Sequence, residues 1–237
     1  MLWCDLRRSI LSRRMAFTIL FGLVCLYLPT FYLLIEEKRW IWENNLVDSL
    51  RDAYGLGIYI FCAPATAAIC ASSLYIQDRK AGVFTMLLQR IGKRRYMISK
   101  VMCCGLAGSC ALVVPVLLFS FFQYSIYAGF KCVPGEWSVI LSDCISLVPF
   151  GFVWAVVGLS LSSWADSVQV AYASPYAIAM LMKIIGSVTG LGWLDPMRQI
   201  SPINTVLIDT WMIVSLQGTL FIASLTVLRI GVKKCAN

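Results

Sequence analysis

The chain has 237 residues, of which 59% are hydrophobic and 14% are charged, and it contains no histidine. Soluble domains are about 45–50% apolar, so this composition excludes a soluble globular protein and indicates one that crosses a membrane several times. The net charge of +8 does not indicate a nucleic-acid partner, because the basic residues lie in short segments beside long apolar runs. The length leaves no room for a large soluble domain.

Residues 1–14 form a basic segment ahead of the first apolar run. Its large apolar side chains fall on one face of a helix: Leu2, Trp3, Leu6 and Ile10. This pattern is typical of an interfacial helix on the inner leaflet, and the simpler alternative is a basic flank that only orients the first span. Both interpretations place the N-terminus inside. The run that follows is too long for a cleavable signal peptide, so we expect it to stay in the membrane.

Six apolar runs are long enough to cross a bilayer, which takes about 20 residues of helix. They predict spans at about residues 15–35, 54–76, 101–123, 139–161, 168–188 and 211–228. The expected fold class is therefore all-α, a polytopic membrane protein with one transmembrane domain over residues 1–237. The stretch 189–210, before the last run, is too apolar for an ordinary external loop.

The distribution of charge predicts the orientation of these spans. With both termini inside, fourteen of the twenty basic residues fall in inner segments, beside three of the twelve acids. Basic residues accumulate in cytoplasmic loops, so the asymmetry favours cytoplasmic termini in a protein integral to the plasma (cytoplasmic) membrane. The inner turn 162–167 carries no basic residue and does not contribute to this argument.

The most basic inner segment, residues 77–100, carries seven Lys or Arg and one acid, Asp78. Its apolar residues divide between two adjoining faces of a short helix that Gly82 would open: Val83, Met86 and Leu87 on one face, Phe84 and Leu88 on the other. They are too few to span a bilayer, so the segment is expected to lie on the membrane surface or to dock onto a partner. An anchor in which bases meet anionic lipid is the simpler alternative.

Groups that could support catalysis are scarce. The absence of histidine excludes Ser-His and Cys-His pairs and histidine metal sites, and without a G-x-x-x-x-G-K-[ST] motif the chain cannot bind ATP through a P-loop. We therefore predict no enzyme activity, no metal and no cofactor on this chain. Most cysteines lie inside apolar runs as small hydrophobes. Cys132 and Cys144 fall near the external face, where we expect free thiols and a bridge is the alternative.

Lys183 is the only charge well inside a predicted span. Its spacing from the inner turn places it in the outer third of the fifth span. Snorkelling of the ammonium to the outer interface is the simpler interpretation. The alternative is a pathway residue that faces an anionic or carbonyl-bearing substrate.

The basic segment resembles a motif of the ABC-2 family of ABC transporter permeases. That motif has an acid, a glycine, an apolar pair, a basic residue ahead of the third span and a closing lysine, matched here by Asp78, Gly82, Leu87-Leu88, Arg95 and Lys100. The six-span hydropathy, the amphipathic N-terminal segment and the apolar stretch before the last span also match. The sequence departs from the family at Gln77-Asp78, where a Glu is frequent, and at Ile91-Gly92, where a Pro is frequent.

The resemblance implies a permease subunit that pairs with a second permease subunit and with a separate P-loop ATP-binding subunit, which would hold ATP and Mg²⁺. It implies that a coupling helix meets the ATPase through Asp78, Gly82, Val83, Phe84, Met86, Leu87, Leu88, Arg90, Arg95 and Lys100. The family mostly exports, so export is favoured. Two alternatives stay open: a non-transporting membrane anchor or sensor of similar architecture, and a secondary carrier or channel.

Overall fold

The structure, a computed structural model, describes residues 2–36, 46–55, 57–70, 72–126, 135–165, 167–196 and 207–236. The regular elements in these ranges are helices, which agrees with the predicted all-α class. They are α1 (Leu2–Ile10), α2 (Arg13–Glu36), α3 (Leu46–Gly55), α4 (Ile58–Ile69), α5 (Leu74–Lys80), α6 (Val83–Ile91), α7 (Lys93–Ile126), α8 (Glu136–Ala165), α9 (Val168–Thr189), the 3-10 turn η2 (Gly192–Leu194) and α11 (Leu207–Ala236).

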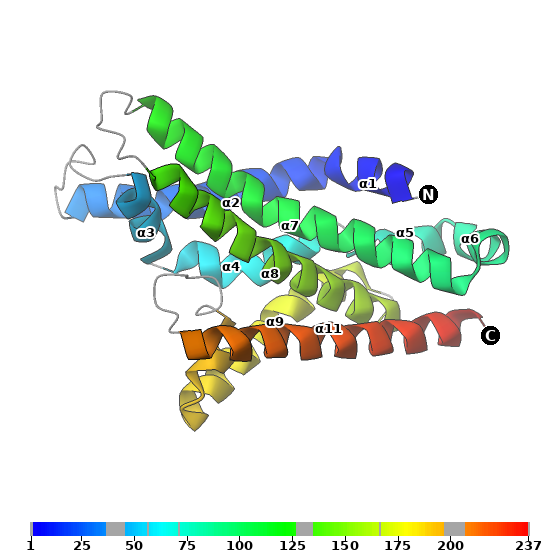
Figure 1. Cartoon of the computed structure of the whole chain (residues 1–237). Coiled ribbons are helices and arrows are strands. Elements are labelled where there is room, and N and C mark those ends of the chain that lie inside the picture. The colour runs from blue at the N-terminus through cyan, green and yellow to red at the C-terminus, as the bar shows by residue number, and fades with distance from the viewer. Residues whose placement is uncertain are drawn as a thin grey trace.

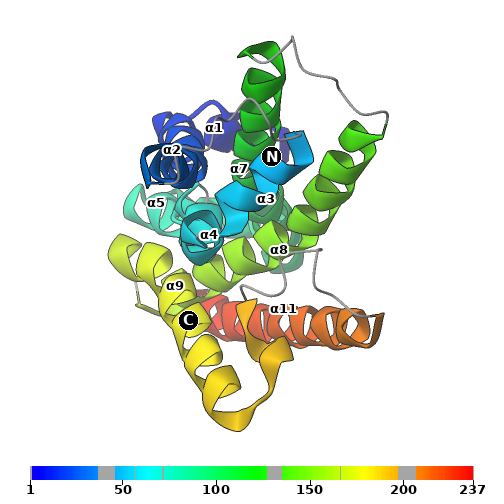
Figure 2. The ribbon, with the colours of Figure 1, turned by 90° about the vertical axis from the view of Figure 1, so that its left-hand side faces the viewer.

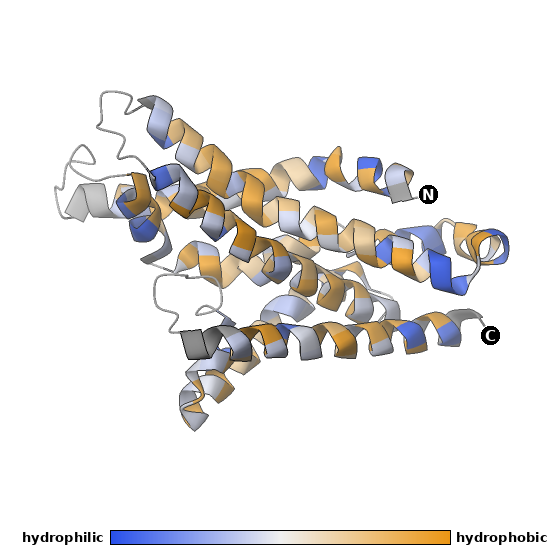
Figure 3. Ribbon diagram, in the orientation of Figure 1, coloured by the Kyte–Doolittle hydropathy of each residue, from blue (hydrophilic) through white to orange (hydrophobic). Residues whose placement is uncertain are grey.

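Six helical segments are long and apolar enough to cross a membrane, as the sequence predicts. They are Arg13–Tyr32, Ile58–Lys80, Lys93–Ser125, Glu136–Trp164, Val168–Thr189 and Trp211–Lys233. The two ends of the chain lie at the same end of the molecule as α5 and α6 (Figure 1). Hydrophilic residues gather there, whereas apolar residues cover the middle of the long helices (Figure 3). We call this the basic end: α1, α5, α6, the start of α7 and the end of α11.

Helix α8 is the centre of the packing. It contacts α4, α7, α9 and α11, and Figure 2, seen from the end opposite the basic end, shows it between α7 and α11. Glycines allow a close crossing: a Cβ on Gly108 of α7 would lie 2.7 Å from the carbonyl oxygen of Gly151 in α8. Small residues let membrane helices pack closely in this way. Trp154, further along α8, is fully buried.

The second predicted span, 54–76, corresponds to Ile58–Lys80 in the structure, but it is not one regular helix. Gly57, with φ of +69°, separates α3 from α4, and α4 ends at Ile69 before α5 begins at Leu74. Glycine adopts this left-handed backbone at little cost, which ends one helix and lets the next change direction. Hydropathy does not mark these breaks, because the residues on both sides of each are mostly apolar.

Helix α7 begins at Lys93, well ahead of the predicted start at 101. Hydropathy marks where a helix enters apolar surroundings, and the helix itself continues through the basic residues at its start. The basic residues of 93–100 are therefore part of the third span's helix.

Candidate partner-docking site

The basic end carries a short helix, α6, between two sharp turns. Gly82 at its start has φ of +68° and Gly92 at its end has φ of +82°, values that a residue with a Cβ adopts only with strain. The Gly82 N–H donates to the Arg79 carbonyl and the Gly92 N–H to the Leu88 carbonyl, each at 3.0 Å. Gly82 thus lies where the sequence predicts the entry to a short helix.

The inner face of α6 is packed into the protein. Phe84 is 4% exposed and Leu88 is 9% exposed. The Phe84 ring meets Tyr75 of α5 and Tyr96 of α7 edge-on, with centroid distances of 5.3 Å and 5.6 Å. Each such pair contributes about 0.5–1.5 kcal/mol beyond the area it buries. The helix is therefore joined to both of its neighbours in the chain.

The opposite side of α6 faces outward. Val83, Met86 and Arg90 follow the spacing i, i+3, i+7, which places them on one helical face. Val83 is 40% and Met86 61% exposed, and Arg90 is exposed as well. Leu87 lies at the edge of this face, partly buried against the core. We call Val83, Met86, Leu87 and Arg90 the outer face of α6.

A buried group of charges lies next to Tyr96. The Nζ atom of Lys100 in α7 is 2.7 Å from Oδ2 of Asp78 in α5 and 2.9 Å from Oδ2 of Asp5 in α1. The Tyr96 hydroxyl donates to Oδ2 of Asp78 at 3.0 Å. We call these four residues the Lys100 network. It ties α1, α5 and α7 together at the basic end.

The charges in this network are nearly balanced. Lys100 is 2% exposed and lies between two carboxylates, and buried charges persist only when they are paired. The two carboxylates carry one more charge than Lys100 neutralises. Arg8, at the surface, compensates this charge, because its Nη1 lies 3.8 Å from Oδ1 of Asp78. Arg8 also donates to Oε1 of Gln77 at 3.0 Å. Helix α1 is thereby fixed to α5 at the surface and to α7 inside.

The predicted coupling residues fall into two groups. Those on the surface or at its edge are Gly82, Val83, Met86, Leu87, Arg90 and Arg95, whereas Asp78, Phe84, Leu88 and Lys100 are buried. Asp78 and Lys100 pair with each other inside the chain, and a contact of either with a partner stays a prediction. They lie behind the outer face of α6, where they join α1, α5 and α7.

Asp5 was missed as a site residue. It is the lone acid of the basic segment 1–14, and a lone acid among arginines is a signal that could have indicated an ion pair. Its partner, Lys100, depends on how α1 packs on α7 and is not readable from spacing. The opposite side of α1 is the packed one: Asp5 and Ser9 are buried there, while Trp3 of the predicted apolar face is 75% exposed.

Lys183 lies in α9, far along the chain from the Lys100 network. It is partly buried, with Nζ 5.6 Å above the ring centroid of Phe61 in α4. It lines a small pocket together with Asp195, just after η2. A cation over an aromatic ring gains about 0.5–1 kcal/mol at a solvated site. Snorkelling and a pathway role both stay predictions.

Two further expectations concern cysteines and metals. Cys144 is a buried free cysteine in α8, and Cys132 lies outside the described residues. Within the described ranges no group of three or more His, Cys, Asp or Glu side chains is arranged to hold a metal ion.

No family model, curated protein or solved structure matches this chain. The resemblance to ABC-2 permeases is therefore carried by the motif residues and the six spans alone. A functional proposal has to be argued from the geometry of the basic end.

Proposed function

We propose that this chain is the membrane-spanning subunit of an ABC-2 type transporter, driven by a separate P-loop ATP-binding subunit that docks on the outer face of α6. The observation that carries the proposal is this face: Val83 and Met86 are exposed on a helix whose other side is fixed in the protein. An exposed apolar patch beside a base suits a groove on a partner protein. ATP and Mg²⁺ would belong to the partner, and this chain would not be an enzyme.

The inner face of α6 gives a route for motion into the membrane. Phe84 packs on Tyr75 of α5 and Tyr96 of α7, and the Lys100 network joins these helices to α1. Helix α5 closes the second span and α7 forms the third. Closure of the ATPases would push α6 and move the ends of both spans as one unit. The family resemblance favours export as the direction of transport.

A second permease subunit, identical or related, would cover part of the apolar surface of α9 and α11. Val188 of α9 is 81% exposed and Trp211 of α11 is 80% exposed. Lipid would cover the rest. The mass of the complex in a lipid nanodisc checks this part of the proposal, which expects two copies of the permease with two ATPases.

The proposal places the basic end in the cytoplasm and the chain in the plasma membrane, with both termini inside. Its support is the concentration of Lys and Arg at that end. Cys4 is exposed on α1. A membrane-impermeant thiol reagent should therefore modify Cys4 in opened membranes and spare it in intact cells, read at this residue by mass spectrometry. Modification of Cys4 in intact cells would reverse the topology.

Met86→Asp tests the docking surface. A carboxylate in a desolvated apolar groove is strongly unfavourable unless it is paired, so the ATPase should no longer co-purify while the chain still inserts. Leu87→Asp should act in the same direction, with some loss of packing because Leu87 is partly buried. Thr85→Asp is the matched control, since it adds the same charge at an exposed position on the flank of α6. Wild-type yield of the ATPase with Met86→Asp would remove the outer face from the proposal.

Reconstitution in vesicles separates the proposal from its alternatives. A transporter of this kind moves substrate only with the ATPase present and ATP hydrolysed. A membrane anchor or sensor would bind the ATPase without flux, and a secondary carrier or channel would give flux without it.

A further inference from the structure

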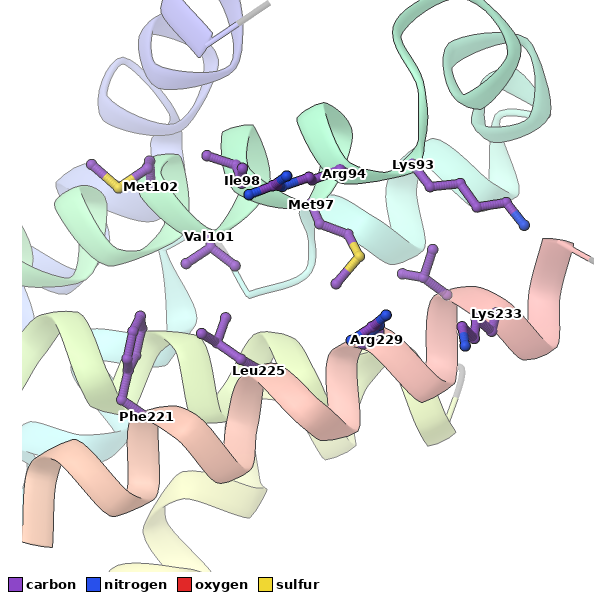
Figure 4. A pocket seen from close by; sticks show the side chains of 11 residues that line it. Lys93, Arg94, Met97, Ile98, Val101, Met102, Phe221, Leu225, Arg229 and Lys233 are labelled. Carbon is purple, nitrogen blue, oxygen red and sulfur yellow. The ribbon is translucent and has the colours of Figure 1, made fainter.

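A groove separates α7 from α11 at the basic end and has a volume of about 770 Å³ (Figure 4). Helix α8 packs against both helices and holds them apart. A Cβ on Gly231 of α11 would overlap Oγ of Ser163 in α8, and a Cβ on Gly105 of α7 would overlap the Phe152 ring of α8. Each helix is thus seated on α8, which leaves the space between α7 and α11 unfilled.

The groove has an apolar floor. Figure 4 shows Met97 and Val101 on α7 across from Leu225 on α11. Phe221 lines one end of the groove and packs on Phe152 of α8, with ring centroids 5.8 Å apart. These residues belong to segments long and apolar enough to cross a membrane, so an occupant of the floor meets apolar surroundings.

The other end of the groove is basic on both sides. Lys93 and Arg94 stand on α7, and Arg229 and Lys233 stand on α11. In the described part of the chain no carboxylate pairs with any of these four side chains. The groove therefore combines uncompensated positive charge at the membrane boundary with an apolar channel that leads from it.

We propose that this groove binds one anionic phospholipid, with its phosphate among the four basic side chains and an acyl chain along the floor. Charge and polarity both match: phosphate accepts hydrogen bonds from arginine in a bidentate manner, and basic residues at the membrane surface attract anionic lipid. A free anion would leave the apolar floor empty. A helix from a second copy would fill the floor and leave four charges unmatched. The bound lipid would join α7 to α11, which α8 otherwise holds apart.

The test is lipid binding to the purified full chain in detergent, measured by native mass spectrometry. Phosphatidylglycerol and phosphatidylcholine with the same acyl chains are the two probes. We expect phosphatidylglycerol to bind about tenfold more tightly, and Arg94→Gln with Arg229→Gln to remove most of this preference. Arg7→Gln with Lys80→Gln is the matched control, because it removes two exposed charges of the basic end from outside the groove and should keep the preference.

Met97→Trp fills the floor without changing the charge, and it should weaken binding of both lipids. The exposed positions of Arg94 and Arg229 make their replacement compatible with folding, so melting without lipid should be unchanged. The proposal is overturned if the Arg94 and Arg229 variant keeps the preference for phosphatidylglycerol. It is also overturned if inorganic phosphate displaces the lipid at equal concentration, or if Met97→Trp changes the oligomeric mass while lipid binding is kept.

Discussion

The region around Lys100, at the basic end, and the region around Lys183, in α9, accommodate a membrane-helix lysine in different ways. Lys100 is 2% exposed and has carboxylate oxygens at 2.7 Å and 2.9 Å from two other helices. Lys183 is partly buried and lies over the Phe61 ring of α4. An ammonium withdrawn from water needs opposite charge, whereas a long stem on an apolar surface can bring its ammonium to water. A lysine at a motif position can therefore be structural, and a motif match alone does not assign it a contact with a partner.

Of the changes compared here, Lys100→Met should lower the stability of the protein the most. The methionine leaves Asp5 and Asp78 buried without their cation, and breaking a buried pair in this way destabilises by about 3–5 kcal/mol. The melting temperature in detergent should fall sharply. Lys183→Met is the matched control, because it removes the same ammonium group from a less buried site, where the side chain lies over the Phe61 ring. The melting temperature of this variant should change little.

The triple change Lys100→Met, Asp5→Asn and Asp78→Asn sharpens the same point. Replacing a whole buried ion group by neutral groups of similar volume is often nearly neutral, and Asn at 78 can still accept from Tyr96. The triple variant should therefore melt much closer to wild type than Lys100→Met. A Lys100→Met protein that melts at the wild-type temperature would mean that the Lys100 network does not stabilise this end.

Gly82→Ala should destabilise the basic end less than Lys100→Met does. A Cβ at Gly82 meets nothing within 4 Å, so the cost arises from the backbone at φ of +68° alone, about 1–2 kcal/mol. Part of this strain would be relieved by turning α6, so ATPase co-purification should fall as well. Gly218→Ala in α11 is the control, because its Cβ also meets open space and its backbone is ordinary helix. A similar loss at both positions would contradict the role of the Gly82 turn.

Local chemistry made much of this end predictable. The apolar runs predict the six spans. Gly82 predicts the entry to a short helix because glycine is the residue that adopts positive φ without strain, and this preference can be read from a single position. The division of α6 also follows from helical periodicity: Phe84 and Leu88 share the buried side, and Val83 and Met86 share the exposed side. Periodicity separates the two faces, but it does not say which one is packed.

Contacts between distant segments could not be read from the sequence. Lys100 meets Asp5 only because α1 folds back along α7. The groove between α7 and α11 exists because α8 is seated against both, through Gly105 and Gly231. The break before α4 was hidden because hydropathy averages over several residues, whereas one glycine at positive φ ends a helix. Packing between helices decides which side chains pair and in which direction each helix runs. The pattern of residues along the chain carries no information about that packing.

Lys183→Met should have the smallest effect on ATP hydrolysis by the assembled complex. Methionine keeps the bulk of the stem and removes the charge, so the contact of the side chain with Phe61 should survive in large part. If the ammonium serves only to reach the outer interface, stimulation of ATP hydrolysis by substrate should stay near wild type, which is the outcome we expect. A loss of about tenfold with intact assembly, equivalent to about 1.4 kcal/mol, would instead mean that substrate meets this charge. Phe61→Leu then separates the two causes, because it removes the ring under Lys183 and leaves the charge in place. Stimulation that falls with Lys183→Met and survives Phe61→Leu would assign the effect to the ammonium itself and would place the pathway beside α4 and α9.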